Sequence, residues 1–343
     1  MKKRIVILFG GQSSEYAVSL ESAASVIEHL DKQRYEPYLI GITTKGEWFK
    51  YEGTTKRIAD DAWQQGKLTP VVLSPAGLWE NGKEVHVDAI LPIMHGKNGE
   101  DGSIQGLIQL SHLPLIGCDV TGSAICMDKH RAHQIVRADG IRVPNHIALF
   151  AGDPLPENLN YPLFVKPNRG GSSLGMSYLL DASGLAQAVD KAFQYDEMVL
   201  LEEEVKGFEV GCAVMGCRQL VAGEVDEIEV GSGFFDYVEK YQLKTASIHV
   251  PARLAQNERQ KIQQLAKRIY RLLGCRGFAR VDLFVLENGE LVFNEVNTIP
   301  GFTSHSRFPS MMKAIGYDMT ELLTILIEEG IKDANSILTA VPN

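Results

Sequence analysis

Residues 277–297 read GFARVDLFVLENGELVFNEVN and predict a β-hairpin. Two strand-like runs flank an Asn-Gly pair, which is the strongest short-range signal for a two-residue turn. Such a turn places Asp282 opposite Glu295 and Arg280 opposite Asn297. Because side chains alternate between the two faces of a strand, these four polar side chains share one face. The hairpin is therefore predicted to carry a polar site on one face and a core on the other.

The core face of the hairpin is predicted to carry five branched apolar residues. They are Val281, Leu283, Val285, Val292 and Val296. On the polar face, directly opposed carboxylates repel each other, so the pair is a poor choice for stability alone. A divalent cation removes this conflict, and oxygen ligands from Asp, Glu and Asn suit Mg²⁺. The alternative is a solvated face on which Arg280 merely offsets the acids.

The composition favours a globular protein with a small ligand. The chain has 343 residues, 45% of them hydrophobic, and a net charge of −9. This charge argues against nucleic acid and against an anionic membrane as partners. The apolar run at residues 5–9 is too short for a signal peptide or a membrane span, so we expect a cytoplasmic protein. Five cysteines form no CxxC pair, which favours buried thiols over disulfides.

Residues 1–121 predict an open α/β domain. An apolar run, RIVILFGG, is followed by a run with helical spacing, SLESAASVIEHL, and by a second apolar run, YLIGIT. This order completes a strand-helix-strand unit. Two further strands and a helix are expected in VDAILPIMHG, LPLIGC (113–118) and SIQGLIQLS. The polar stretch 48–71 is expected to be partly irregular.

The pattern changes after this domain. TGSAICMDKHRAHQIVRADGI predicts one helix that begins at Thr121 or Ser123 and ends before Gly140. Four apolar runs then predict strands: YPLFVKP, GMSYLL, EMVLLEEEV and FEVGCAVMG. Residues 262–273 form a helical stripe near the C-terminus. We divide this part of the chain into two units, 122–201 and 202–343.

The segment LFVKPNRGGSSLGMSYLL suggests a phosphate-binding loop. Lys166 ends an apolar strand, and a Gly/Ser loop with Ser172 and Ser173 follows, whose backbone N–H groups could surround phosphate oxygens. The order excludes a Walker A loop, in which the lysine follows the glycines and opens a helix. No HRD or DFG motif of a protein kinase is present. A hairpin over a triphosphate fits best, and an ordinary mobile hairpin is the alternative.

Several other polar groups have two interpretations each. Lys129 lies on the helix of the second unit and is either solvated or in reach of a phosphate. His130 and His133 share a helix face, but no acid or cysteine accompanies them in the sequence, so we favour a structural role over a metal site. The acids around residues 202–209 form either a solvated edge or a site for ribose hydroxyls. Glu15, after the first strand, is stabilised by a helix dipole or binds an ammonium group.

Seven motifs together resemble the ATP-grasp superfamily and, within it, the D-alanine:D-alanine ligase family. They are LFGGQSSEYAVSL, HGKNGEDGSIQG, MDKHRAH, VKPNRGGSSLGMS, FFDYVEKY, GCRGFARVDLF and NEVNTIPGFTSHSR, and they span nearly the whole chain. The resemblance implies an α/β protein with two ATP-grasp lobes, 122–201 and 202–343. An N-terminal Rossmann-like domain, 1–121, precedes them. A lid at 231–250 and a magnesium-binding hairpin at 277–297 are also implied.

The resemblance further implies roles for individual residues toward ATP and metal. Asp282, Glu295 and Asn297 would hold two Mg²⁺ ions, with Mn²⁺ as an alternative. The groups expected to bind ATP are Lys129, Lys166, Ser172, Ser173 and Lys240 at the phosphates, Glu202 at the adenine and Glu209 at the ribose.

Other residues are implied for the two amino-acid substrates. Glu15 would bind the first ammonium, in a hydrogen-bonded set with Ser172 and Tyr241 and with His95 nearby. Arg280 and the N–H of Gly301 would stabilise a tetrahedral oxyanion. Ser306 would bind the carboxylate of the second substrate.

Two departures from the usual family pattern concern the second substrate. Arg307 replaces an apolar residue, and the lid reads FFDYVEKYQL, as in D-alanine:D-serine ligases of the vancomycin-resistance type. A guanidinium there could hydrogen-bond a serine hydroxyl. D-lactate-forming relatives also carry the arginine but lack the lid tyrosine, so Tyr241 favours an amine nucleophile.

The sequence therefore predicts an ATP-dependent D-alanine:D-serine ligase for peptidoglycan precursors. Housekeeping D-alanine:D-alanine ligation is the close alternative. A ligase for other acids and a nucleotide-sensing domain without chemistry are more distant ones. A dehydrogenase is disfavoured because no GxGxxG fingerprint is present. Relatives suggest a homodimer.

Overall fold

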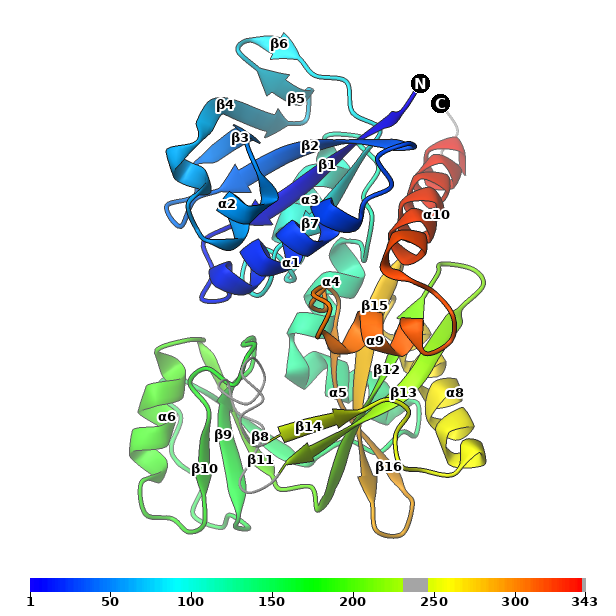
Figure 1. The fold of residues 1–343 in the computed structure, drawn as a ribbon. Helices are drawn as coiled ribbons and strands as arrows, with labels where there is room; N and C mark the ends of the chain where they lie inside the picture. Colours follow the sequence, from blue (N-terminus) through cyan, green and yellow to red (C-terminus); the bar gives the residue numbers. More distant parts are fainter. Residues whose placement is uncertain (231–245, 341–343) are drawn as a thin grey trace.

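The computed structural model describes residues 1–230 and 246–340, which form three sheets (Figure 1). The N-terminal sheet has the order β6-β5-β4-β3-β2-β1-β7. Its strands are β1 (Lys3–Gly10), β2 (Tyr35–Ile42), β3 (Trp48–Glu52), β4 (Lys67–Ser74), β5 (Gly77–Glu80), β6 (Lys83–Glu84) and β7 (Ala89–Ile93). β1 runs parallel to both β2 and β7, with α1 (Tyr16–His29) between β1 and β2. The predicted strand-helix-strand unit is confirmed.

One strand predicted for the N-terminal domain was wrong. The run 113–118 is no strand but a single bridge between Leu115 and Ile90, since Pro114 has no N–H to donate to a ladder. The stretch 48–71 is partly irregular as predicted, at residues 53–54, 60–62 and 66, but most of it is regular. It contains β3, α2 (Thr55–Ala59), the short helix η1 (Trp63–Gln65) and the start of β4. The buried ring of Trp63, edge-on to Phe9 at 5.3 Å, anchors this otherwise polar segment to the core.

The helix predicted after residue 121 is broken into two. α4 (Val120–Met127) and α5 (Lys129–Ala138) meet at Asp128, whose backbone leaves the helical region. The Asp128 carboxylate accepts a hydrogen bond from the N–H of Arg131 at 3.0 Å and so caps α5. The break makes Lys129 the first residue of α5. α3 (Ser103–Leu110) forms as predicted.

Two antiparallel sheets make up the rest of the described chain. The four-stranded sheet, in the order β10-β9-β11-β8, contains β8 (His146–Phe150), β9 (Leu163–Pro167), β10 (Ser177–Leu179) and β11 (Met198–Glu203), with α6 (Leu185–Phe193) packed on it. The five-stranded sheet, in the order β14-β13-β12-β15-β16, contains β12 (Gly207–Met215), β13 (Val221–Val230), β14 (Ala246–His249), β15 (Phe278–Leu286) and β16 (Leu291–Asn297), with α8 (Gln256–Leu272) packed on it. The two sheets face each other across the lower part of the molecule (Figure 1).

The β15–β16 hairpin has the predicted register at its polar end only. Asp282 pairs with Glu295 as predicted, and Arg280 pairs with Asn297. The turn, however, contains three residues, because the N–H of Leu286 bonds to the carbonyl of Glu290. A bulge between the third and fourth pairs from the polar end restores the predicted alignment.

The bulge also changes the face of one predicted core residue, Val292, which is nevertheless fully buried. Phe293, rather than Val292, belongs to the hydrophobic cluster under α8. Val292 pairs instead with Phe284. The other four predicted core residues of the hairpin are buried in that cluster.

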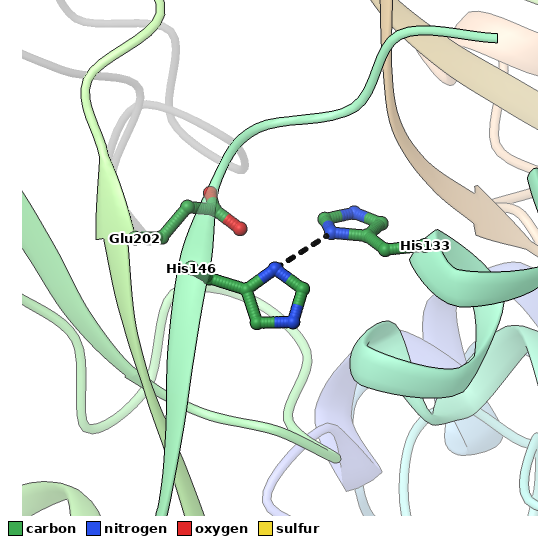
Figure 2. A group of neighbouring side chains, drawn as sticks. All are labelled: His133, His146 and Glu202. Atoms are coloured by element: carbon green, nitrogen blue, oxygen red, sulfur yellow. Dashed lines mark hydrogen bonds between the residues drawn. The ribbon is translucent and has the colours of Figure 1, made fainter. Parts of the chain in front are cut away.

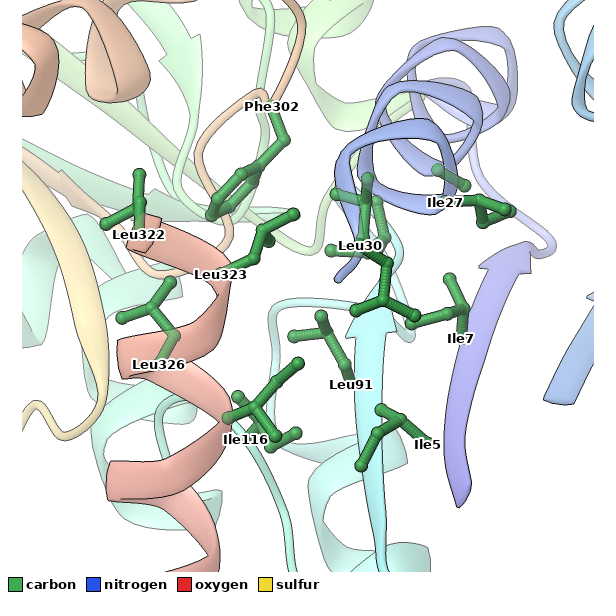
Figure 3. Packing of buried hydrophobic residues seen from close by; sticks show 14 of the residues in the cluster. Ile5, Ile7, Ile27, Leu30, Leu91, Ile116, Phe302, Leu322, Leu323 and Leu326 are labelled. Atoms are coloured by element: carbon green, nitrogen blue, oxygen red, sulfur yellow. The ribbon is translucent and has the colours of Figure 1, made fainter. Parts of the chain in front are cut away.

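The C-terminal helices join the domains. α9 (Arg307–Lys313) and α10 (Met319–Ala340) follow the hairpin, and α10 lies beside the N-terminal sheet. Leu322, Leu323 and Leu326 of α10 share a buried cluster with Leu91 of β7 and with Ile116 (Figure 3). The predicted unit 202–343 is thus packed against the first domain. No described helix combines the length and apolar character needed to cross a membrane.

Candidate active site

A cavity of about 410 Å³ lies between the four-stranded and five-stranded sheets. Charged and loop residues on its wall include Lys129, Lys166, Gly170, Gly171, Ser172, Ser173, Glu202, Glu203, Glu204, Glu209 and Glu295. They come from α5, β9, β11, β12, β16 and the β9–β10 and β11–β12 loops. Seven of them were predicted as site residues, namely Lys129, Lys166, Ser172, Ser173, Glu202, Glu209 and Glu295, and the fold gathers them at one place.

Two lysines supply positive charge to the cavity. Nζ of Lys166 lies 2.6 Å from Oε1 of Glu202, and both side chains are buried. Nζ of Lys129 donates to the carbonyl of Gly170 at 2.7 Å and lies 3.2 Å from Oε2 of Glu295. Ammonium groups held in place by carboxylate and carbonyl partners are suited to phosphate oxygens.

The loop between β9 and β10 has an unusual backbone. Ser172 and Ser173 both adopt positive φ angles, 52° and 57°. Residues other than glycine, Asn and Asp seldom adopt this left-handed conformation, which costs free energy unless the surroundings enforce it. Because β9 and β10 are antiparallel, the loop is the predicted hairpin rather than a Walker A turn.

A buried polar group next to this loop contains Glu15. The hydroxyl of Ser172 donates to Oε1 of Glu15. The backbone of Gly171 passes so close that a Cβ there would lie 2.6 Å from Oε2 of Glu15. The loop therefore contacts the N-terminal domain at the residue predicted to bind the first substrate's ammonium.

His95 lies at the same junction and is fully hydrogen-bonded. Its ring nitrogens lie 2.8 Å from the carbonyl of Ile299 and 3.1 Å from the hydroxyl of Ser22. Burial lowers the pKa of His95, so the ring is neutral.

Glu100 was not predicted from the sequence. Its carboxylate oxygens accept hydrogen bonds from the N–H of Gly96 at 2.9 Å and from the N–H of Ile299 at 2.9 Å. Glu100 thus joins the loop after β7 to the loop that carries Gly301 and Ser306. Its position within the motif HGKNGEDG was the only sequence signal for it.

We expect Glu100 to make stability depend on pH. Burial, and then the charge of Glu15, raise the pKa of Glu100 from 4.5 to about 8. The folded protein therefore keeps this proton between pH 4.5 and 8, where the unfolded chain has lost it. The resulting stabilisation is complete below pH 4.5 and is lost as the pH rises through 8.

Urea unfolding of the wild type and of Glu100→Gln at pH 5, 6.5 and 8.5 measures this effect. Because the side chain is partly exposed, we expect the unfolding free energy of the wild type, relative to the variant, to fall by about 2 kcal/mol over this range. If the unfolding free energy of the wild type relative to Glu100→Gln stays constant or grows with pH, the raised pKa of Glu100 is contradicted.

The polar face of the hairpin forms an ion network. Asp282, only 1% exposed, accepts hydrogen bonds from Nε and Nη2 of Arg280 at 2.8 and 2.7 Å and from Nδ2 of Asn297 at 2.9 Å. Glu295, directly across from Asp282, points to the cavity and to Lys129. The alternative of a merely solvated face does not describe this arrangement.

Arg307 belongs to the same network. Its Nε and Nη2 donate to the two oxygens of Asp226 at 2.7 and 2.8 Å. Its Nη1 donates to Glu209 at 2.9 Å and lies 3.4 Å from Asp282. The guanidinium is thus held by three carboxylates, and contact with a substrate hydroxyl would require the exchange of one of them. The role of Arg307 in serine recognition stays a prediction.

The strand below this network carries a glycine for a steric reason. A Cβ on Gly211 of β12 would lie 2.4 Å from Nη2 of Arg307 and 2.7 Å from Oδ1 of Asp226. The glycine also donates its N–H to Oδ1 of Asp226 at 2.7 Å. Any larger side chain here would displace the arginine.

The remaining predicted site residues are placed as follows. The hydroxyl of Ser306 accepts from the N–H of Thr303 at 3.0 Å, within the loop that leads to α9. Gly301 lies in the same loop, where a Cβ would approach that hydroxyl to 2.7 Å. Lys240, Tyr241 and most of the predicted lid, 231–245, lie outside the described residues.

The donor set of the hairpin fits a hard divalent cation. Asp282, Glu295 and Asn297 present oxygen ligands only, and the cavity adds loop backbone and two lysines for phosphate groups. A second hollow of about 690 Å³ lies on the N-terminal domain. Its charges are paired with one another, for example Lys50 with Glu80 at 3.2 Å, so the smaller cavity is the better candidate site.

Comparison with known proteins identifies the family. Sequence models described as D-ala D-ala ligase N-terminus and D-ala D-ala ligase C-terminus match residues 4–118 and 144–328. The chain belongs to the D-alanine:D-alanine ligase family. The predicted resemblance, the predicted ATP-grasp fold and the predicted class of ATP-dependent carboxylate-amine ligases are confirmed.

Three members of the family illustrate the similarity. The vancomycin/teicoplanin A-type resistance protein VanA of Enterococcus faecium is 44% identical over 96% of this chain and 98% of its own. A D-alanine–D-alanine ligase of Ruminiclostridium cellulolyticum is 39% identical over 95% of each chain. The crystal structure of the VanG D-Ala:D-Ser ligase from Enterococcus faecalis has a TM-score of 0.89 and 46% identity, and it covers 96% of this chain and 100% of its own.

Proposed function

We propose that this enzyme uses ATP to join D-alanine to a second D-amino acid, with preference for D-serine, through a D-alanyl phosphate. The observation that carries the proposal is the cavity between the two sheets, where Lys129 and Lys166 line one wall and Glu295 lies on the hairpin. Family membership supports ATP as the phosphoryl donor.

The first step is assigned to the junction of the loop and the N-terminal domain. The ammonium of D-alanine binds Glu15, whose carboxylate is held by Ser172. A carboxylate oxygen of D-alanine attacks the γ-phosphorus of ATP, the P–O bond to ADP breaks, and ADP leaves with the electron pair. Lys129 and Lys166 offset the charge of the phosphates.

The second step forms the amide bond. The amine of the second substrate, as its free base, attacks the acyl carbon. The C–N bond forms, the C–O bond to phosphate breaks, and the nitrogen loses one proton, which leaves with the departing phosphate. Arg280 and the N–H of Gly301 stabilise the oxyanion, while Ser306 holds the second carboxylate.

Magnesium is assigned to Asp282, Glu295 and Asn297, and when bound it would neutralise the phosphate oxygens during transfer. Arg280 and Asn297 donate hydrogen bonds to the buried carboxylate of Asp282. These bonds offset its negative charge and reduce its repulsion of Glu295. The network thus preserves the acid pair in its aligned position.

The preference for D-serine rests on the likeness to VanG and on Arg307. D-alanine as second substrate is the alternative, supported by the likeness to the Ruminiclostridium ligase. A single hydroxyl contact changes the difference in activation free energy between D-serine and D-alanine by about 1 to 3 kcal/mol when its partner would otherwise be left unpaired.

The test is ADP release from ATP with D-alanine alone, with D-alanine plus D-serine, and with D-alanine plus D-lactate. Chromatography then identifies the products. We expect D-alanyl-D-serine to dominate at equal concentrations of D-alanine and D-serine. Absence of the mixed dipeptide, with D-alanyl-D-alanine formed, would favour the alternative. No ADP under any condition would refute the ligase assignment.

A further inference from the structure

Two histidines and a glutamate meet beside the cavity (Figure 2). His133 comes from α5, His146 from β8 and Glu202 from β11, where Glu202 is the direct cross-strand partner of His146. The Nδ1 atoms of the two rings are 3.5 Å apart. Each residue offers one ligand atom, and all three atoms lie within 4.8 Å of one another. His133 and Glu202 are buried, and His146 is half-buried.

The Nε2 atoms of both rings, which point away from the cluster, have hydrogen-bond partners. Nε2 of His133 lies 2.7 Å from the carbonyl of Asn294, to which it donates its proton. Nδ1 of His133 therefore carries a lone pair and points to His146. Nε2 of His146 lies 2.8 Å from Nδ1 of His130. Histidines that ligate metals usually have such an outer hydrogen bond, which fixes the tautomer and the ring orientation.

One carboxylate oxygen of Glu202 lacks a hydrogen-bond partner among the described residues. Its Oε1 is held by Lys166 at 2.6 Å. Its Oε2 is buried and has no hydrogen-bond partner among the residues that the structure describes. Buried polar atoms normally have a partner, so an orphan oxygen next to two inward-facing ring nitrogens calls for an explanation.

We propose that His133, His146 and Glu202 form a Zn²⁺ site, separate from the oxygen site of the hairpin. Two nitrogens bound to a tetrahedral zinc at about 2.0 to 2.1 Å are about 3.4 Å apart, which matches the 3.5 Å between the two Nδ1 atoms. A modest rotation of the glutamate brings its oxygen into range. Two histidines, one carboxylate and an open fourth position form a common zinc ligand set.

The ligand types separate the two sites chemically. Imidazole nitrogens favour zinc and other late transition metals, whereas the carboxylates and amide of the hairpin favour magnesium. Lys166 stays on the other oxygen of Glu202 and limits the affinity by its charge.

Zinc at this place would add a link between α5 and the four-stranded sheet. His133 lies on α5, which bonds to β16 through the carbonyl of Asn294. His146 and Glu202 belong to the opposite sheet. One ion would therefore cross-link the two sheets that enclose the cavity and raise the thermal stability of the protein.

The test is equilibrium dialysis of chelator-treated protein against Zn²⁺ in excess magnesium, which fills the oxygen site, followed by elemental analysis. We expect one zinc per chain, a rise in Tm with zinc, and at least tenfold weaker binding in His133→Asn and in His146→Asn. His29→Asn, which removes an exposed imidazole from the end of α1, is the matched control and should bind zinc like the wild type.

Cobalt gives a readout that does not depend on stability. Co²⁺ in place of zinc should give the strong visible absorption of a tetrahedral site in the wild type and in His29→Asn, and lose it in His146→Asn, whose half-buried position tolerates substitution better than that of His133. Less than one zinc per chain in the wild type, or unchanged zinc binding in both ligand variants, would overturn the proposal.

Discussion

Replacing Arg280 with methionine is expected to lower kcat for ADP formation by about a thousandfold. The guanidinium is partly buried and is held in a fixed orientation by two hydrogen bonds to Asp282, so its charge is already oriented for the oxyanion role that we propose. Methionine fills a similar volume but offers no donor. The measurement is coupled ADP release with D-alanine and D-serine at saturation.

The matched control for this variant is Arg276→Met. Arg276 forms a comparable paired contact, with Nε and Nη2 donating to Asp333, but it precedes β15 and its partner is not the hairpin acid Asp282. We expect its kcat to stay within a few-fold of the wild type. Circular dichroism checks that both variants are folded. Equal losses of activity in the two variants would show that Arg280 has no special role.

Replacing Asp226 with asparagine is expected to lower the free energy of unfolding by about 3 kcal/mol. Asp226 is fully buried and receives two hydrogen bonds from Arg307 and one from the N–H of Gly211. Without its charge, the buried guanidinium keeps only Glu209 and a longer contact to Asp282. An unpaired charge in the interior is costly because water cannot reach it.

Urea unfolding at pH 7 measures this loss. Glu229→Gln is the control, because Glu229 pairs with Arg253 at the surface and should contribute less than about 1 kcal/mol. The double variant Asp226→Leu/Arg307→Met removes both charges and should be more stable than Asp226→Asn. A loss below about 1 kcal/mol for Asp226→Asn would mean that Glu209 and Asp282 alone suffice for Arg307.

The β15–β16 hairpin shows which features a local sequence pattern predicts and which it does not. Alternation of polar and apolar residues predicted the facing of Asp282 and Glu295 correctly. The turn was wrong by one residue, since Gly289, with φ of +79°, closes a three-residue loop. The bulge near Asn294 cancelled this error at the polar end. A local pattern fixes the face of a side chain, whereas loop length and bulges depend on packing against neighbouring strands.

Helix α5, which carries His130 and His133, contributes to a cluster that the local sequence did not predict. In the sequence, His130 and His133 have no acidic companion, and a structural role seemed the better interpretation. The fold brings His146 and Glu202 to them from two strands of the opposite sheet. Nothing in the local sequence indicates which strand will face a helix, so this cluster could not be predicted.

The sequence by itself determined the family, the three-part order of strands and helices, and the set of lysines, acids and loop residues that line the cavity. These follow from periodicity and from motifs, which are properties of neighbouring residues. Only the tertiary structure decided the partners of Arg307, the contact of Glu100 with two loops, and the packing of α10 on the first domain. Such contacts join residues far apart in the chain, and which of them form depends on how all buried groups can be packed and paired at once.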